Sequence, residues 1–326
     1  MLENNLPKFN AAVLDGYTLN PGDLSWNELS TLCDVKIYDN TSEKQIFEHA
    51  NDCEIIFTNK VVISKEVITA LPKLKYIGVL ATGFNVVDII AAKNAGIVVT
   101  NIPSYSTDSV AQLTIAFIFN FMWNVQKHSD EVHEGKWSNS KHFCYQSFPV
   151  YELVGKTLGI VGFGNIGQAV ARIGISLGMN VVYSNRSRKT VPELSSAKQV
   201  ELNELFSIAD FITLNCPLND ATYHLINSST LSKIKNTAYI INTARGPIVD
   251  EIAVSKALKE KTLAGYGTDV LSTEPPSADN PLLGAPNCVI TPHLAWQTFE
   301  ARKRMSEILV ENLKSFLSGN IKNQVN

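Results

Sequence analysis

The sequence predicts an α/β protein of two domains, each built on a sheet of parallel strands. Short apolar runs alternate with helical stretches along most of the chain, which is typical of parallel strands covered by helices on both faces. A turn with three glycines at 162–167 lies near the middle of the 326 residues. Apolar residues form 45% of the chain and charged residues 18%, a composition that can fill two ordinary hydrophobic cores.

Five strands are expected in the first half of the chain. They are the apolar runs 11–14, 35–38, 54–58, 76–80 and 97–100. One helix should run from Ser64, a good capping residue, to Leu71, where Pro72 ends it. A second helix is expected over 86–94, with Gly96 as its stop. Because this half lacks a glycine-rich turn, we interpret it as an α/β domain that is not the dinucleotide binder.

A long, mostly apolar helix should connect the two domains. It begins near Thr107 or Asp108, which are both good caps, and runs toward Trp123 or beyond. Apolar residues lie around most of its circumference, which predicts a largely buried helix. The segment from Gly135 to Phe148 is irregular and rich in aromatic residues. It is either a loop packed on its own domain or an exposed arm that packs on a partner subunit.

The second half continues the alternation of strands and helices. After the strand that leads into the glycine turn, strands are expected at 180–183, 211–215, 239–243, 265–269 and 289–291. This succession is typical of a Rossmann-type domain. An amphipathic helix should close the chain at 299–317. If that helix belongs to the first domain, the chain crosses between the domains twice.

The glycine turn is the clearest functional signal in the chain. Gly162 allows a tight turn, Gly164 lets a pyrophosphate approach the backbone, and Gly167 lets the following helix pack closely on the strand. The helix N-terminus then offers N–H groups and the positive end of the helix dipole to the phosphates. Because a strand precedes the turn and a helix follows it, dinucleotide binding is favoured over an unrelated glycine-rich turn.

The residues after the next strand bear on which dinucleotide binds. In NAD-binding domains an Asp or Glu about 20 residues past the glycines accepts hydrogen bonds from the ribose hydroxyls. Asn185 stands at that place here, and Arg186, Ser187 and Arg188 follow it. Two arginines and a hydroxyl attract the 2′-phosphate of NADP, which an acid would repel. We therefore expect NADP(H), with NAD(H) as the alternative; a solvated basic turn would favour neither.

Three late segments each follow a predicted strand and carry chemically useful side chains. They contain Arg245, Glu274 and His293. Because the carboxyl ends of parallel strands face the ligand crevice, these side chains should converge there. An arginine binds a carboxylate through two hydrogen bonds, a histidine delivers a proton, and a carboxylate holds the imidazole. The set suits reduction of a 2-keto acid, although each residue alone could equally be a surface charge or a packed loop residue.

Taken together, these motifs resemble those of the D-isomer-specific 2-hydroxyacid dehydrogenase family. The resemblance extends from Thr58 to Trp296 and, more weakly, to both ends of the chain. It rests on the glycine turn and on three segments in the family's order: N-T-A-R-G at 242–246, D-V-x-x-x-E-P at 269–275 and T-P-H at 291–293. The family fold implies a Rossmann domain, residues 108–296, inserted in a flavodoxin-like substrate domain, residues 1–107 and 297–326.

The resemblance also implies roles for individual residues. Arg245, Glu274 and His293 are the implied catalytic trio, and the backbone of Ala81, Thr82 and Gly83 is implied to hold the substrate carboxylate. The residues expected to contact the cofactor, with Asp269 at its nicotinamide end, are Gly162, Gly164, Asn165, Ile166, Gly167, Asn185, Arg186, Ser187, Arg188, Cys216, Pro217, Thr243, Ala244 and Asp269. Family members are usually dimers with a cleft that closes on the substrate, so we expect a homodimer.

Within the family, the chain looks most like the glycerate dehydrogenase (hydroxypyruvate reductase) branch. The similarity lies at 81–88, 105–112, 137–145 and Trp296. The implied reaction reduces hydroxypyruvate or glyoxylate to the D-2-hydroxy acid, glycerate or glycolate, with NAD(P)H and with His293 as proton donor. Two residues depart from the family pattern: Asn185 replaces the usual acid, and Pro247 replaces a common glycine, where it should only stiffen the loop.

Several alternatives stay open. A phosphoglycerate dehydrogenase could bind its substrate phosphate with Lys60, although the C-terminal extension of many such enzymes is not seen. Two further alternatives are another D-2-hydroxyacid dehydrogenase and a non-enzymatic dinucleotide sensor similar to the family's corepressors. The intact catalytic trio argues against the sensor. Formate dehydrogenases carry Gln at the position of Glu274, which argues against that activity.

Composition argues against several other classes. A net charge of −3, without basic runs, makes nucleic acid an unexpected partner. The most apolar stretch, 113–123, is shorter than the roughly 20 residues of a membrane span, and Met1–Asn5 has no signal-peptide character. Five scattered cysteines and six histidines show no metal-ligand spacing, so we expect no metal and buried free thiols. The cytoplasm is the expected compartment.

Overall fold

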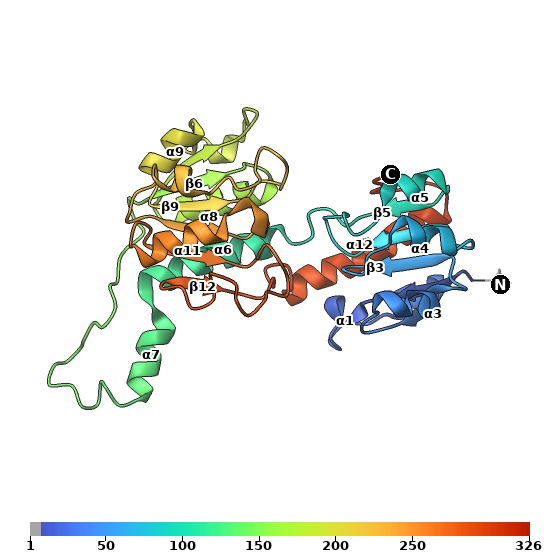
Figure 1. Ribbon diagram of the computed structural model, residues 1–326, viewed down its shortest axis with the longest axis horizontal. Helices are drawn as coiled ribbons and strands as arrows, with labels where there is room; N and C mark the ends of the chain where they lie inside the picture. Colours follow the sequence, from blue (N-terminus) through green and yellow to red (C-terminus); the bar gives the residue numbers. More distant parts are fainter. Residues whose placement is uncertain (1–7) are drawn as a thin grey trace. The chain divides into compact units, whose positions relative to one another are not determined.

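The computed structural model describes residues 8–326, in two compact units. The first unit runs to Ser106 and includes Gln297–Asn326, and the second is Thr107–Trp296 (Figure 1). The expectation about Met1–Asn5 lies outside the described residues. Each unit contains one parallel sheet, so the predicted α/β class with two parallel sheets is confirmed.

The sheet of the first unit has five parallel strands. They are β1 (Asn10–Val13), β2 (Asp34–Ile37), β3 (Ile55–Thr58), β4 (Tyr76–Val79) and β5 (Val98–Thr100). Their spatial order is β2-β1-β3-β4-β5, which is the flavodoxin-like order. All residues of β3 and β4 are buried, because these strands are covered on both faces, as is usual for parallel sheets.

Short helices and one long helix cover this sheet. They are α1 (Gly16–Leu19), α2 (Asn27–Leu32), η1 (Glu43–Gln45), α3 (Ile46–Ala50), α4 (Lys65–Ala70), α5 (Ile89–Asn94) and α12 (Phe299–Leu317). Ser64 caps α4 as predicted. The helix expected over 86–94 begins only at Ile89: Val87 donates to Phe84 O in a turn and bridges to Ile63, and Asp88 then caps the helix.

The C-terminal helix α12 completes the first unit. It packs against α1, α2 and β4. Beyond it, Val325 N donates to Val99 O at 2.9 Å, and Thr100 pairs with Gln324 in an isolated antiparallel bridge. The chain therefore leaves the first unit after Ser106 and returns to it at Gln297.

The sheet of the second unit has seven parallel strands. They are β6 (Thr157–Val161), β7 (Asn180–Ser184), β8 (Lys198–Gln199), β9 (Phe211–Leu214), β10 (Tyr239–Asn242), β11 (Gly265–Thr268) and β12 (Cys288–Ile290). Their order, β12-β11-β10-β9-β6-β7-β8, reverses direction beside β6, as in Rossmann folds. The predicted strands match within one residue at each end, but the short edge strand β8 was not predicted.

The second unit contains helices on both faces of its sheet and one, α7 (Val125–His133), that lies away from it (Figure 1). The other helices are α6 (Thr107–Trp123), α8 (Asn165–Ser176), η2 (Pro192–Leu194), α9 (Leu202–Ile208), α10 (Ser228–Leu231), η3 (Gly246–Ile248) and α11 (Glu251–Lys259). Side chains of α6 and α8 share one core with Ile241, whereas α9 and α11 share another with Ile240. Because successive strand residues point to opposite faces, these two cores lie on opposite sides of the sheet.

Most of α6 is buried or half-buried, as predicted, but one face remains uncovered. Phe119 is 38% exposed and Trp123 46%, and Ala116 on the same face is also exposed. Asn124 then adopts a left-handed conformation, and α7 leads away from the rest of the unit (Figure 1). On the irregular segment that follows, Phe143 is 92% exposed.

The cysteines are all free, as expected, but they are not all buried. Cys33 and Cys53 lie in the first unit's core, whereas Cys144 is exposed on the irregular segment after α7. Cys216 and Cys288 are partly buried.

Candidate active site

The glycine turn between β6 and α8 has the geometry that a bound dinucleotide requires. Gly162 has a φ of 93°, and a Cβ there would lie 2.7 Å from the backbone of Asn215 and Cys216. A Cβ on Gly167 would collide with the carbonyl oxygen of Gly162. Gly164, by contrast, has open space around its Cβ position and directly precedes α8, whose N-terminus includes Asn165 and Ile166. The turn is therefore closed on the protein side and open beside the helix N-terminus, which fits a pyrophosphate.

Asn185 links this glycine turn to the basic turn after β7. Its Oδ1 accepts a hydrogen bond from Phe163 N at 3.0 Å, and its Nδ2 donates to Ser187 O at 2.8 Å. Both bonds go to backbone atoms of the protein. Asn185, at the position of the usual acid, therefore connects the glycine turn to the basic turn. Arg186 and Arg188 are exposed and form no ion pair with a described residue.

The other late motif residues follow neighbouring strands. Thr243, Ala244 and Arg245 follow β10, Asp269 follows β11, and His293 comes shortly after β12. Since β10, β11 and β12 are adjacent and parallel, their carboxyl ends bring these segments to one edge of the sheet.

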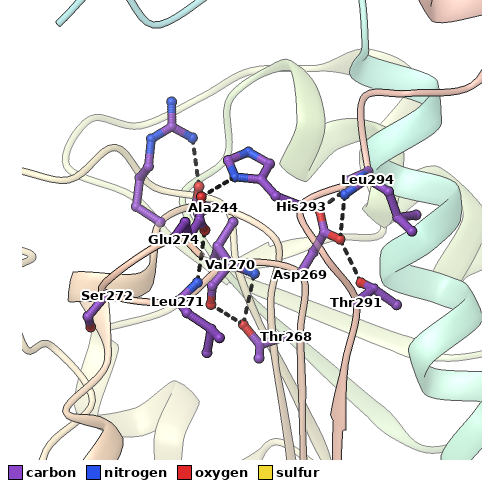
Figure 2. A network of polar contacts seen from close by, with 12 residues as sticks. Ala244, Thr268, Asp269, Val270, Leu271, Ser272, Glu274, Thr291, His293 and Leu294 are labelled. Atoms are coloured by element: carbon purple, nitrogen blue, oxygen red, sulfur yellow. Dashed lines mark hydrogen bonds and ion pairs between the residues drawn. The ribbon is translucent and has the colours of Figure 1, made fainter. Parts of the chain in front are cut away.

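Glu274 and His293 are in direct contact at this edge (Figure 2). The Nδ1 atom of His293 lies 2.6 Å from Oε2 of Glu274. The other carboxylate oxygen, Oε1, accepts a hydrogen bond from Leu271 N at 2.9 Å, which fixes the carboxylate relative to its own loop. Because Nδ1 faces the carboxylate, Nε2 of the imidazole is the nitrogen that can exchange a proton with a ligand. About a quarter of the His293 side chain is exposed.

Asp269 builds the turn on which His293 stands. Its Oδ1 accepts hydrogen bonds from Thr291 Oγ1 at 2.6 Å and from Leu294 N at 2.9 Å, and its Oδ2 accepts from Ala295 N at 2.8 Å (Figure 2). His293 itself has a φ of 53°, a left-handed conformation that its neighbours must enforce. Burial raises the pKa of the Asp269 carboxyl, and these hydrogen bonds oppose the shift. Asp269 thus holds the histidine in place, in addition to the cofactor contact expected for it.

Arg245 lies on the neighbouring segment, and no described hydrogen bond or ion pair joins its guanidinium to Glu274 or His293. Its Nη1 donates to Ala244 O at 2.7 Å, and its side chain is exposed. The guanidinium forms no ion pair with any described carboxylate, so its remaining donors are available to a ligand.

The remaining expected cofactor residues lie after β9 and β10. Cys216 and Pro217 follow β9, and the Cys216 backbone packs against Gly162. Burial raises the pKa of the Cys216 thiol to about 11, so this group is uncharged at neutral pH. Thr243 is buried, and its hydroxyl shares a hydrogen bond with Thr114 of α6.

The expected substrate loop, Ala81-Thr82-Gly83, belongs to the first unit and follows β4. Ala81 O accepts from Ile102 N at 3.0 Å, and Thr82 Oγ1 donates to Ile102 O at 2.8 Å. The N–H groups of Thr82 and Gly83 donate to no described residue. These two amides are therefore available to an anion.

Comparison with known proteins identifies the chain. Residues 115–295 match the model of the family described as D-isomer specific 2-hydroxyacid dehydrogenase, NAD binding domain. The chain belongs to this family. It is thus a dehydrogenase that interconverts 2-keto acids and D-2-hydroxy acids with a nicotinamide dinucleotide.

Relatives cover this dehydrogenase almost from end to end. It is 44% identical to a hydroxypyruvate reductase of Blautia hydrogenotrophica, over 96% of this chain and 98% of the relative. It is 37% identical to a glycerate dehydrogenase of Methylorubrum extorquens, over 93% and 95%.

Solved structures of the same architecture carry both kinds of nicotinamide cofactor. An acyclic imino acid reductase in complex with NADPH and D-Arg superposes with a TM-score of 0.84 at 30% identity, covering 97% of this chain and 100% of that chain. A D-lactate dehydrogenase of Aquifex aeolicus complexed with NAD and lactic acid gives 0.81 at 30% identity, covering 95% and 96%.

Sequence patterns did not reveal the residues that support the His293 turn of this dehydrogenase. Thr291 was seen only as part of the T-P-H motif, although its hydroxyl binds Asp269. Ser109 of α6 donates to Ala295 O at the end of the same turn. A serine at the start of a helix does not by itself indicate this contact, because Ser109 and Ala295 are far apart in sequence.

Within residues 8–326, no group of three or more His, Cys, Asp or Glu side chains is placed to hold a metal ion. None of the helices described there has the length and apolar character needed to cross a membrane.

Proposed function

We propose that the protein reduces hydroxypyruvate or glyoxylate, giving D-glycerate or glycolate. The observation that carries the proposal is the Glu274–His293 contact of 2.6 Å at the carboxyl edge of the second sheet. The names of the relatives support the substrate: a hydroxypyruvate reductase, a glycerate dehydrogenase and several glyoxylate reductases. Both substrates are small 2-keto acids with one carboxylate.

His293 acts as the proton donor in this proposal. A reduced nicotinamide, when bound, supplies the hydride that reaches the carbonyl carbon. Protonated His293 gives the proton from Nε2 to the carbonyl oxygen as negative charge develops there. Glu274 holds Nδ1, so the ring keeps one orientation and its positive charge is stabilised before the transfer.

Arg245 and the loop 81–83 are proposed to bind the substrate. The guanidinium of Arg245 can pair with a carboxylate through two parallel hydrogen bonds and can polarise the adjacent carbonyl. In the first unit, the available N–H groups of Thr82 and Gly83 also suit an anionic group.

We infer a preference for NADP(H) over NAD(H). The exposed arginines Arg186 and Arg188 lie directly after Asn185. The side-chain amide of Asn185 is already hydrogen-bonded to the backbone of Phe163 and Ser187. An Asp at this position would repel a 2′-phosphate, whereas the two guanidinium groups would attract it.

We also propose that two copies of the chain form a homodimer through the second unit. The exposed face of α6 carries Phe119 and Trp123, and the segment after α7 exposes Trp137 and Phe143. Apolar side chains gathered on one face and on a protruding segment are typical of a surface that another protein covers. This favours the arm alternative for residues 135–148.

The decisive experiment measures kcat/KM for NADH and NADPH with hydroxypyruvate, glyoxylate, pyruvate and phosphohydroxypyruvate. The expected result is the highest value for hydroxypyruvate or glyoxylate with NADPH. Preference for phosphohydroxypyruvate would instead support the phosphoglycerate dehydrogenase alternative. Absence of turnover with every pair would contradict an enzymatic role and leave the dinucleotide-sensing alternative.

The same assay tests the roles of the trio. His293→Ala should lower kcat by about 100- to 10,000-fold, the range for loss of a general acid. Arg245→Ala should also lower turnover by orders of magnitude, and circular dichroism should show an intact fold in both variants. Near-normal activity in either variant would rule out this mechanism.

A further inference from the structure

The loop that carries Glu274 has little structure of its own. Between the end of β11 at Thr268 and the start of β12 at Cys288, the chain contains bends and turns but no helix or strand. Regular backbone bonding therefore does not fix Glu274. Side-chain contacts must set the position of its carboxylate relative to His293.

Glu251, the first residue of α11, contacts this loop on both sides of Glu274. Its Oε1 accepts a hydrogen bond from Ser272 N at 2.7 Å, and its Oε2 accepts from Asn280 Nδ2 at 2.8 Å. One turn further along α11, Ser255 Oγ donates to Pro281 O at 2.6 Å. Residues four apart lie on the same helix face, so the start of α11 holds the loop from 272 to 281.

The same helix start is joined to the segment that carries Arg245. Only η3, Val249 and Asp250, which caps α11, separate Arg245 from Glu251 in the chain. Gly246 packs so closely on the backbone of Leu271 and Ser272 that a Cβ there would collide with it. The Arg245 segment and the Glu274 loop therefore share one contact region, and the Glu251 carboxylate bonds to the loop beside it.

We propose that Glu251 is a positioning residue for the reduction, acting through Ser272 and Asn280 to hold Glu274 against His293. Only the expected loss of kcat rests on the proposed function. The contacts between Glu251 and the loop do not depend on which substrate the enzyme reduces. Glu251 itself contacts neither Glu274 nor His293 and takes no part in proton transfer.

The chemistry of the contact requires a carboxylate at position 251. Both of its partners are N–H donors, so both side-chain oxygens must accept. The Asn280 amide cannot simply turn over, because its Oδ1 already accepts from Leu282 N at 3.0 Å. A glutamine at 251 would present one N–H to another N–H, and one loop contact would be lost.

The test exchanges the two polar groups. Glu251→Gln leaves two donors facing each other, and Asn280→Asp places a second carboxylate beside Glu251. In the double variant E251Q/N280D, the new amide at position 251 can donate to the new carboxylate at position 280, while the amide oxygen still accepts from Ser272.

Each single variant should lower kcat by about 10- to 100-fold, as expected for a catalytic group that is displaced by a fraction of an ångström to one ångström. The double variant should recover most of the loss, and the KM for NAD(P)H should stay nearly constant.

Glu260→Gln is the matched control. Glu260 follows the same helix, and Lys256, at 3.8 Å on the surface, is its one ion-pair partner among the described residues. It should leave kcat unchanged. If the single variants also keep wild-type kcat, or if the double variant is no better than the worse single variant, Glu251 does not position the site.

Hydrogen–deuterium exchange tests the role of Glu251 independently of the substrate. Amides of 271–282 should exchange faster in E251Q than in the wild type, and at the wild-type rate in the double variant, whatever the enzyme reduces. Unchanged exchange in E251Q would overturn the proposal even in an active enzyme. A wild type that reduces none of the 2-keto acids would refute the proposed function, while the exchange experiment would still decide whether Glu251 holds the loop.

Discussion

At the scale of single residues, one ionic contact fixes the start of α12 within the first unit. Arg302 is 7% exposed and donates from Nη1 and Nη2 to the two carboxylate oxygens of Asp23, each at 2.6 Å. The guanidinium also donates to Leu19 O and Gln297 O. A paired guanidinium with most of its donors satisfied tolerates burial, whereas removal of its partner would leave the charge poorly compensated.

This contact predicts an acid-dependent loss of stability. The hydrogen bonds from Arg302 hold the pKa of Asp23 below its ordinary value of 3.8. A carboxyl whose pKa is lower in the folded state stabilises the fold above its unfolded pKa, and this contribution disappears as the pH falls through the folded pKa. Asp23→Asn should therefore lower Tm at neutral pH, and the difference from the wild type should shrink below about pH 4.

Thermal melts followed by circular dichroism across this pH range measure the effect. Asp34→Asn is the control, because Asp34 is exposed and its carboxylate has no partner among the described hydrogen bonds and ion pairs. Parallel Tm curves for D23N and the wild type would contradict the assignment of acid sensitivity to this pair.

At the scale of elements, we propose that the turn after β7 sets the preference between NADP(H) and NAD(H). The variant R186A/R188A should raise the KM for NADPH by about 10- to 100-fold, which corresponds to loss of one or two charge-assisted hydrogen bonds. The KM for NADH should change little, because NADH carries no 2′-phosphate. Steady-state kinetics with both cofactors measure the ratio.

Arg172→Ala on the exposed surface of α8 removes a similar charge from the same domain away from this turn. It should leave the NADPH:NADH ratio unchanged. A hundredfold preference of the wild type for NADH would refute our interpretation of Arg186 and Arg188.

At the scale of the whole molecule, the exposed face of α6 predicts the oligomeric state. Phe119→Glu places a carboxylate in the middle of the proposed apolar interface, where it would be buried without a partner. Light scattering after size-exclusion chromatography should show a dimer for the wild type and a monomer for this variant. Ile90→Glu is the control, since Ile90 is 71% exposed in the first unit and lies outside the proposed interface. A monomeric wild type would contradict the homodimer.

Most strands of each sheet could be predicted because a strand is marked by a run of apolar residues that are adjacent in the sequence. Apolar runs of strand length located the strands of both units within one residue, except for β8. That strand is the exposed pair Lys198–Gln199, and without an apolar run it left no pattern to detect. The start of α5 was misplaced because Val86 and Val87 are apolar but take part in a turn and a bridge to a distant segment.

Patterns along the chain were enough to predict the succession of strands, the glycine turn and the residues that we propose to carry the chemistry. Each of these depends on residues close together in the chain. The folded structure was needed to show that Glu274 faces Nδ1 of His293, that Asp269 holds the histidine turn, and that Glu251 holds the Glu274 loop. It was also needed to show which face of α6 stays exposed. These properties depend on contacts between residues far apart in sequence, and such contacts exist only once the strands have taken their order in the sheet.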